Sequence, residues 1–163
     1  MKKRSLIASL TLLMVGVLGC DHATKQLARS HLRDRSPVDI VSGVLELTYT
    51  ENEGAAFNLD RVLPAGMRKP LIILARLVII PLVVVLWARK RGQALSGNAA
   101  FTLLLAGALG NFVEQLLLGH VTDFIHLTHW PVFNVADIAL TAGAVLLLLS
   151  SPSLRPRPES PRP

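Results

Sequence analysis

The sequence contains one cysteine, Cys20, few charged residues and no internal repeat. A single cysteine excludes an internal disulfide and a cysteine-rich metal site. His126 and His129 are spaced as two metal ligands could be, but no further ligand cluster accompanies them, so we expect no metal. Charged residues make up 17% of the 163 residues and hydrophobic residues 51%, with a mean hydropathy of +0.47. A soluble domain needs more polar surface, so the composition indicates a small membrane protein with one domain.

The basic residues exceed the acidic ones by a formal charge of +6, which could in principle serve a nucleic-acid partner. They gather instead at the ends of apolar runs, at residues 2–4 and 89–91, and near the C-terminus as Arg155, Arg157 and Arg162. This distribution is typical of membrane topology, so we expect no nucleic-acid partner. The positive-inside rule predicts that both termini and the loop after the second apolar run are cytoplasmic.

Four apolar segments are expected to span the membrane, over residues 6–24, 70–88, 99–118 and 132–150. A span needs about 20 residues, and the last three segments are long enough. The apolar part of the first, Leu6–Cys20, is short and also matches the hydrophobic region of a signal peptide.

The residues between the first two spans, 25–69, are expected on the outer side of the membrane, together with residues 119–131. Within them, residues 44–50 alternate apolar and polar side chains, which predicts a half-buried strand of a small sheet. Residues 1–151 should form the membrane domain. Residues 152–163 are rich in proline and should form a disordered cytoplasmic tail.

The stretch Val17-Leu-Gly-Cys20 also resembles the cleavage box of a lipoprotein, with Cys20 as the lipidated residue. A lipoprotein, however, normally continues into a water-soluble domain, whereas three more spans follow here. Asp21, Thr24 and Lys25 are spaced i, i+3, i+4, so they continue the first helix on one face. We therefore interpret the stretch as part of an uncleaved first span.

Polar residues occur where a membrane helix should be apolar. Asn111, Glu114 and Gln115 share one face of the third span, and that face should turn into the bundle because polar groups are costly in lipid. Asp123 follows this helix, and Asp137 lies near the start of the fourth. Because the third span runs outward and the fourth inward, both carboxylates should lie at the outer end of one hairpin.

Each feature also has a purely structural interpretation. Asn134 with Asp137 resembles a helix N-cap with an acidic third residue. Asp123 could be an exposed loop residue, residues 52–54 a turn, and the polar face of the third span a set of interhelical hydrogen bonds. Arg76, inside the second span, is interpreted as extending towards the outer headgroups.

Five blocks in order closely resemble the lipoprotein signal peptidase family, also called type II signal peptidases. The blocks are Asp21-His-Ala-Thr24-Lys25, Asn52-Glu-Gly54-Ala55-Ala56-Phe57, Gly107-Ala-Leu-Gly110-Asn111, Val121-Thr-Asp123-Phe124-Ile125 and Phe133-Asn134-Val-Ala136-Asp137. The resemblance covers nearly all of the chain except the tail. It implies an all-α membrane protein, a four-helix transmembrane bundle with an extracytoplasmic β-sheet cradle. It also implies an aspartyl endopeptidase of the bacterial inner membrane, which cuts the signal peptide from a prolipoprotein before its diacylglyceryl-modified cysteine.

The resemblance also implies the roles of individual residues. The catalytic pair falls on Asp123 and Asp137, at the periplasmic side of the membrane. The residues that support this pair or bind substrate are Asp21, Lys25, Asn52, Gly54, Asn111, Glu114, Gln115, Asn134 and Ala136. The family usually has Asp-Arg where this chain has Glu114-Gln115, so an acid is one methylene longer and a basic residue is absent.

The chemistry agrees with these residues independently of the family. Two carboxylates that share a proton can hydrolyse a peptide bond without a cofactor, since one takes a proton from water while the other assists the carbonyl. The implied partners are diacylglyceryl-modified prolipoproteins, membrane lipids and peptide antibiotics that mimic the substrate. Two other functions remain open: a non-cleaving paralogue that binds lipid-modified peptides or such an antibiotic, and a structural or transport bundle.

Overall fold

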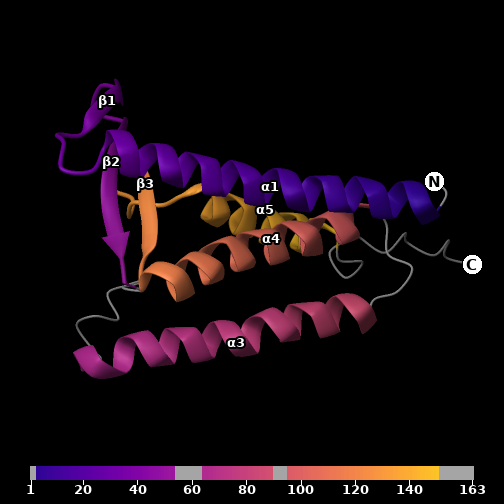
Figure 1. The fold of residues 1–163 in the computed structure, drawn as a ribbon. Coiled ribbons are helices and arrows are strands. Elements are labelled where there is room, and N and C mark those ends of the chain that lie inside the picture. The colour runs from indigo at the N-terminus through magenta and orange to yellow at the C-terminus, as the bar shows by residue number, and fades with distance from the viewer. Residues whose placement is uncertain (1–2, 54–63, 90–94, 151–163) are drawn as a thin grey trace, which may run out of the picture.

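A computed structural model describes residues 3–53, 64–89 and 95–150 of the chain. Four helices and three strands make up these residues, and Figure 1 shows their arrangement. In chain order they are α1 (Lys3–His31), β1 (Val38–Val41), β2 (Leu45–Asn52), α3 (Ala65–Arg89), α4 (Leu95–Leu118), β3 (Val121–Leu127) and α5 (Val135–Leu149). The tail predicted over residues 152–163 lies outside the described residues.

Helices α1, α4 and α5 pack side by side, and α3 lies on another side of α4 (Figure 1). Small residues allow α4 and α5 to approach closely. A Cβ atom on Gly107 would lie 2.4 Å from the backbone oxygen of Ala136, and one on Gly143 would lie 2.9 Å from that of Ala100. Close contact through small residues is the usual packing of membrane helices, because lipid gives no hydrophobic force between them.

Among the described residues, three helices are long and apolar enough to cross a membrane, over Arg4–His31, Lys69–Arg89 and Leu95–Leu118. The first extends past residue 24, where the predicted span ends. The fourth apolar helix, α5, is shorter, with 15 residues. It begins after Asn134, the N-cap that the structural interpretation proposed, so the first residues of the apolar segment 132–150 precede the helix, and Phe133 pairs with Ile125 in an isolated bridge.

The three strands form an antiparallel sheet in the order β1-β2-β3, at the end of the molecule where α1 and α4 finish (Figure 1). The strand predicted over residues 44–50 is β2. Its partner β3 was not predicted, and Asp123 therefore lies in a strand, opposite Thr50, rather than in a loop. The first four residues of β3 are all buried, so the alternation by which a half-exposed strand is recognised is missing.

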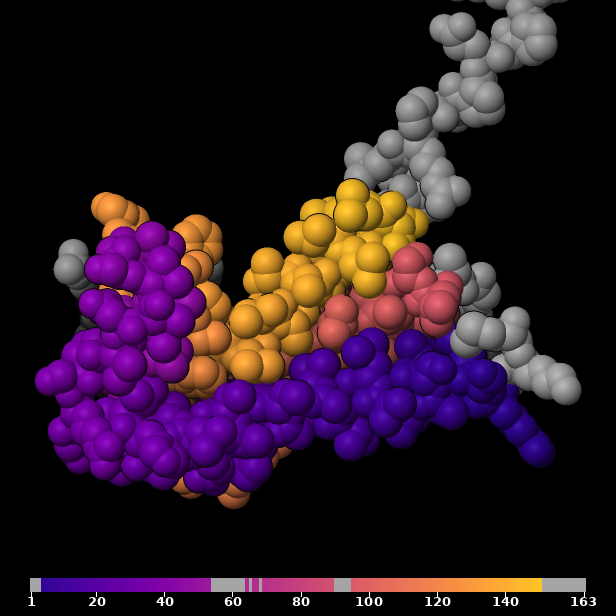
Figure 2. Space-filling view, turned by 90° about the horizontal axis from the view of Figure 1, so that it is seen from above, coloured from indigo at the N-terminus to yellow at the C-terminus, as the bar shows by residue number. Residues whose placement is uncertain are grey.

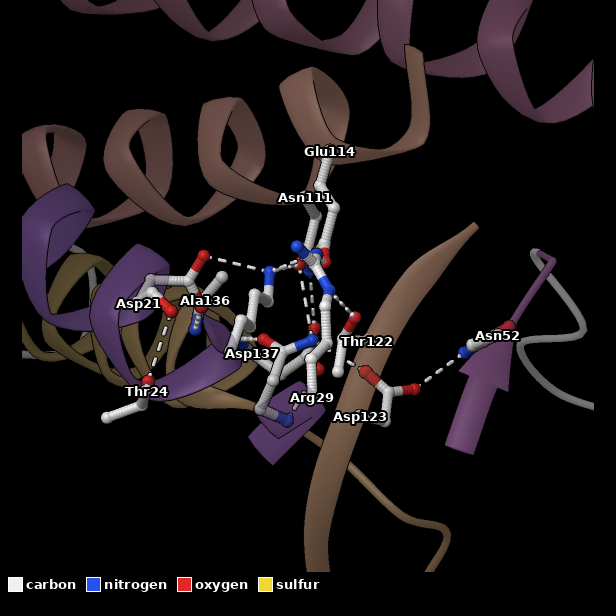
Figure 3. A network of polar contacts seen from close by, with 12 residues as sticks. Asp21, Thr24, Arg29, Asn52, Asn111, Glu114, Thr122, Asp123, Ala136 and Asp137 are labelled. Carbon is white, nitrogen blue, oxygen red and sulfur yellow. Dashed lines mark hydrogen bonds and ion pairs between the residues drawn. The ribbon is translucent and has the colours of Figure 1, made fainter. Parts of the chain in front are cut away.

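The space-filling view shows that the strands project beyond α1, and that a notch separates them from α5 (Figure 2). Most of the polar residues predicted from the sequence gather at the junction of α1, β3, α4 and the start of α5 (Figure 3).

Candidate functional site

The first turn of α5 fixes the position of Asp137. The Asn134 side chain accepts a hydrogen bond from the Asp137 backbone N–H, and the Asp137 carboxylate accepts one from the Asn134 backbone N–H, both over 3.1 Å. This reciprocal capping box satisfies two N–H groups that the helix start would leave unpaired. The structural interpretation of this pair is therefore correct, and it also gives the Asp137 carboxylate a defined orientation.

Asn134 also joins Asp137 to Asp123. Its side-chain Nδ2 donates to Asp123 Oδ1 over 2.6 Å, while its backbone N–H donates to Asp137 Oδ2. The two remaining carboxylate oxygens accept hydrogen bonds from other elements: Asn52 Nδ2 on β2 donates to Asp123 Oδ2, and Asn111 Nδ2 on α4 donates to Asp137 Oδ1, both over 2.9 Å. Figure 3 shows Asn52 directed at Asp123 from the neighbouring strand. Every oxygen of the pair thus has a fixed donor.

Lys25 on α1 determines which way the Asn111 amide points. Lys25 Nζ donates to Asn111 Oδ1 over 2.7 Å, and Asn134 Nδ2 donates to the same oxygen over 3.2 Å. Because that oxygen accepts both bonds, the Asn111 NH2 group must face Asp137. The buried Lys25 ammonium group on α1 therefore orients the Asn111 amide, which donates to Asp137.

Four charged side chains, three of them buried and Arg29 partly exposed, form an ionic cluster behind Asn111. Lys25 lies 2.8 Å from Asp21 and 2.9 Å from Glu114, and Arg29 forms a further ion pair with Glu114. Asp21 and Lys25 are each 2% exposed and Glu114 is 8% exposed. Buried charges are tolerated only when they are paired, so this cluster holds α1 firmly against α4.

The cluster extends to the start of α5. Asp21 Oδ1 accepts a hydrogen bond from the Ala136 backbone N–H over 2.9 Å. Gly110 makes room for this carboxylate, since a Cβ atom there would lie 2.9 Å from Asp21 Oδ2. The block that contains Gly110 and Asn111 therefore serves both the close approach of α1 and the orientation of the pair.

Asp123 is 3% exposed, although it carries an ionisable group. Burial, with a smaller contribution from nearby Asp137, raises the pKa of Asp123 to about 6, although hydrogen bonds from Asn52 and Asn134 oppose the rise. Asp137 is half-buried, so the pair is reached by solvent from the Asp137 side. A carboxyl group that keeps its proton up to about pH 6 beside a second carboxyl group is suited to general acid–base chemistry.

The other predicted site residues lie around this pair, with two exceptions. Gly54 lies outside the described residues. Gln115 is 2% exposed, and its Nε2 donates to the Gly119 backbone oxygen over 2.8 Å at the end of α4, so its contact is with the helix end rather than with either aspartate.

The sequence interpretation missed Arg29 and Thr122, and it assigned Arg76 to the wrong position. Arg29 donates to Thr122 Oγ1 over 3.1 Å as well as to Glu114, and so ties α1 to the residue before Asp123. Its spacing of i+4 from Lys25 could have indicated this role. Arg76 does not extend to the headgroups: its Nη1 donates to the Asn111 backbone oxygen over 3.1 Å.

A groove of about 400 Å³ lies between α1 and α4, with the ionic cluster at its base and leucines such as Leu18 and Leu109 in its walls. Neither Asp123 nor Asp137 lines it. Within the described residues, no group of three or more histidine, cysteine or acidic side chains is placed to hold a metal ion. The groups with which this arrangement can act on a substrate are its two carboxyl groups and the amides that donate to them.

Comparisons with known proteins agree with this architecture. The profile of the family described as "Signal peptidase (SPase) II" matches residues 13–152. A lipoprotein signal peptidase of Syntrophomonas wolfei is 40% identical over 131 residues, covering 79% of this chain and 83% of the relative. A lipoprotein signal peptidase of Chlorobium phaeovibrioides is 34% identical over 151 residues, covering 84% and 86%.

A solved structure described as a bacterial membrane enzyme is also similar, with a TM-score of 0.77 and 29% sequence identity. The match covers 88% of this chain and 92% of that one. The similarity of fold agrees with the mostly helical architecture and the small sheet. With a family profile and relatives that cover most of its length, the chain belongs to the signal peptidase II family.

Proposed function

We propose that this chain is a lipoprotein signal peptidase, which removes the signal peptide from a prolipoprotein on the N-terminal side of the diacylglyceryl-modified cysteine. The observation that carries the proposal is the bridge of Asn134 between Asp123 and Asp137 in a chain of this family. Two of its relatives carry the name lipoprotein signal peptidase, and nothing about them favours a non-cleaving protein or a transport bundle.

The enzyme is of the aspartic type, and Asp123 and Asp137 are its catalytic residues. One carboxylate takes a proton from a water molecule, whose oxygen bonds to the scissile carbonyl carbon. The other carboxyl group gives its proton to the carbonyl oxygen, which yields a gem-diol. The C–N bond then breaks as the nitrogen takes a proton back from the pair and a diol hydroxyl returns one to it, leaving a carboxylic acid and a free cysteine amine.

The neighbouring residues keep the pair ready for this reaction. Asn111 and Asn134 orient the two carboxyl groups, and Lys25 fixes Asn111. Asn52 lies where a substrate backbone would pass beside Asp123. Asp21 and Glu114 hold Lys25 in place, and Asp21 also bonds the Ala136 N–H. Gln115 lies at the helix end that would border the substrate, and Gly54 is assigned to substrate binding from the family resemblance alone.

The peptidase domain comprises residues 1–151 and crosses the inner membrane four times, with α5 as the fourth span. Both termini are cytoplasmic, because the basic residues gather there and after α3. The sheet and the pair then lie at the periplasmic side. A C-terminal reporter enzyme that is active only in the periplasm should remain inactive, and activity of that reporter would contradict this topology.

Lipid-modified prolipoproteins would reach the site from the bilayer, since α3 exposes apolar side chains such as Leu74 and Val78. Peptide antibiotics that mimic the lipid-modified substrate would compete for the same position. Such a competitor should slow cleavage without modifying the enzyme covalently.

The test is cleavage by the purified full chain in phospholipid nanodiscs. The substrate is a synthetic prolipoprotein peptide that carries a diacylglyceryl-modified cysteine, and the products are identified by mass spectrometry. We expect one product that begins with the modified cysteine and one that ends at the residue before it. An otherwise identical peptide without the diacylglyceryl group should not be cut at that bond. No cleavage, or equal cleavage of both peptides, would contradict the proposed function.

A further inference from the structure

Arg76 is a cation in an otherwise apolar helix. It is the only charged residue in Leu71–Leu86, which forms most of α3. Charged side chains at membrane depth are costly, and those that occur there usually face the protein interior and serve a function. The direction in which Arg76 points therefore indicates what it does.

The Arg76 guanidinium faces α4 at the level of the aspartate pair. Its Nη1 donates to the backbone oxygen of Asn111, the residue whose side-chain Nδ2 donates to Asp137. Arg76 lies within electrostatic range of Asp137 and Asp123, and also of Glu114 in the ionic cluster. Asn111 thus contacts Arg76 through its backbone oxygen and Asp137 through its side chain.

Arg76 differs from the other cations of the site in its partners. Lys25 and Arg29 are held in ion pairs by Asp21 and Glu114. Within residues 3–53, 64–89 and 95–150, Arg76 has no carboxylate in ion-pair contact, and its bond to Asn111 is its only hydrogen bond. A guanidinium carries five N–H donors in a planar fork, so several are available to a ligand. A ligand with carbonyl oxygens would match them.

We infer that Arg76 is a further catalytic residue, whose guanidinium donates to the carbonyl oxygen of the peptide bond that is cut. This role rests on the proposed function. As water adds to the carbonyl carbon, the electron pair of the C=O bond moves to the oxygen, which also receives the proton from the pair. Arg76 transfers no proton; it stabilises the negative charge that builds on this oxygen before the proton arrives. Preorganised donors at such a position act strongly because water is excluded.

The test compares Arg76→Gln and Arg76→Lys with the unmodified chain, as full-length proteins in nanodiscs with the diacylglyceryl-modified peptide. Loss of one such donor typically lowers kcat on the order of 100-fold, so we expect that loss in R76Q with little change in KM. Lysine keeps the charge without the fork, and R76K should retain more activity than R76Q, within about tenfold of the unmodified chain. The matched control is Arg89→Gln, an exposed cation at the end of the same helix, which should leave kcat unchanged.

Thermal unfolding of each variant separates catalysis from packing. If R76Q unfolds like R89Q and has a normal kcat, the inference is wrong. It is also wrong if R76Q raises KM and lowers the unfolding temperature while kcat stays the same, because Arg76 would then only hold α3 against α4. No cleavage by the unmodified chain would overturn the proposed function and this role with it, whereas cleavage by the unmodified chain and R76Q alike would overturn this role alone.

Discussion

Replacing Lys25 with methionine should destabilise the protein strongly, because it leaves buried carboxylates without their partner. Lys25 Nζ lies within 2.9 Å of carboxylate oxygens of both Asp21 and Glu114, and it is 2% exposed. Breaking a buried ion pair by removing one member typically costs about 3–5 kcal/mol. Glu114 keeps Arg29, and Asp21 keeps the Ala136 N–H, so we expect the lower end, about 3 kcal/mol.

For a chain of this length, 3 kcal/mol corresponds to a fall in Tm of about 6–12 °C. Thermal unfolding in detergent micelles, followed by circular dichroism, measures it. The matched control is Lys69→Met, because the Lys69 side chain is 47% exposed and, among the described residues, its ion-pair partner is the exposed Glu53. Exposed pairs contribute less than about 1 kcal/mol, so K69M should shift Tm by no more than about 4 °C.

The double variant Asp21→Asn/Lys25→Met provides the decisive comparison. It removes the charge of Asp21, one of the two buried carboxylates that K25M leaves without their lysine partner. The double variant should therefore unfold at a higher temperature than K25M, although it carries one more substitution. If K25M unfolds like K69M, or if the added D21N lowers Tm further, the ionic cluster does not hold α1 in the way described.

Three further predictions concern packing, orientation and protonation. Gly107→Ala should lower stability by about 1–3 kcal/mol because its Cβ would lie 2.4 Å from the Ala136 oxygen, whereas Gly16→Ala, with nothing within 4 Å, should be neutral or stabilising in the same unfolding assay. Asn134→Ala should lower kcat as well as Tm, since it removes a donor to Asp123 in addition to the helix cap. A kcat equal to that of the unmodified chain would contradict this. Because burial raises the pKa of Asp123 to about 6, the pair loses its shared proton as the pH rises through that value, and kcat/KM should fall about tenfold per pH unit above it. A flat profile between about pH 5 and pH 8 would contradict this assignment.

Features that depend on local pattern could be predicted from the sequence. Apolar runs of sufficient length indicated the helices, and the alternation over residues 44–50 indicated β2. The hairpin of the third and fourth apolar segments predicts that Asp123 and Asp137 lie at one end, and Asn134 bonds both of them there.

Features that depend on packing between distant segments could not be predicted in the same way. β3 is buried on both faces, so its sequence has no alternation to recognise. The apolar segment 132–150 begins three residues before α5 because Val132 and Phe133 are apolar, although they precede the cap. Arg76 was assigned to the headgroups because its partner on α4 is a backbone oxygen, which no side-chain pattern reveals.

The central claim is that Asp123 and Asp137 together perform the cleavage, and substitution of each by asparagine tests it most directly. Single-turnover rates should be measured for D123N, D137N and the control Asp39→Asn, which lies exposed in β1, with the diacylglyceryl-modified peptide in nanodiscs. We predict that D39N cleaves like the unmodified chain, whereas D123N and D137N insert and fold but release no product. Cleavage by D137N or D123N at the rate of the unmodified chain would contradict the account.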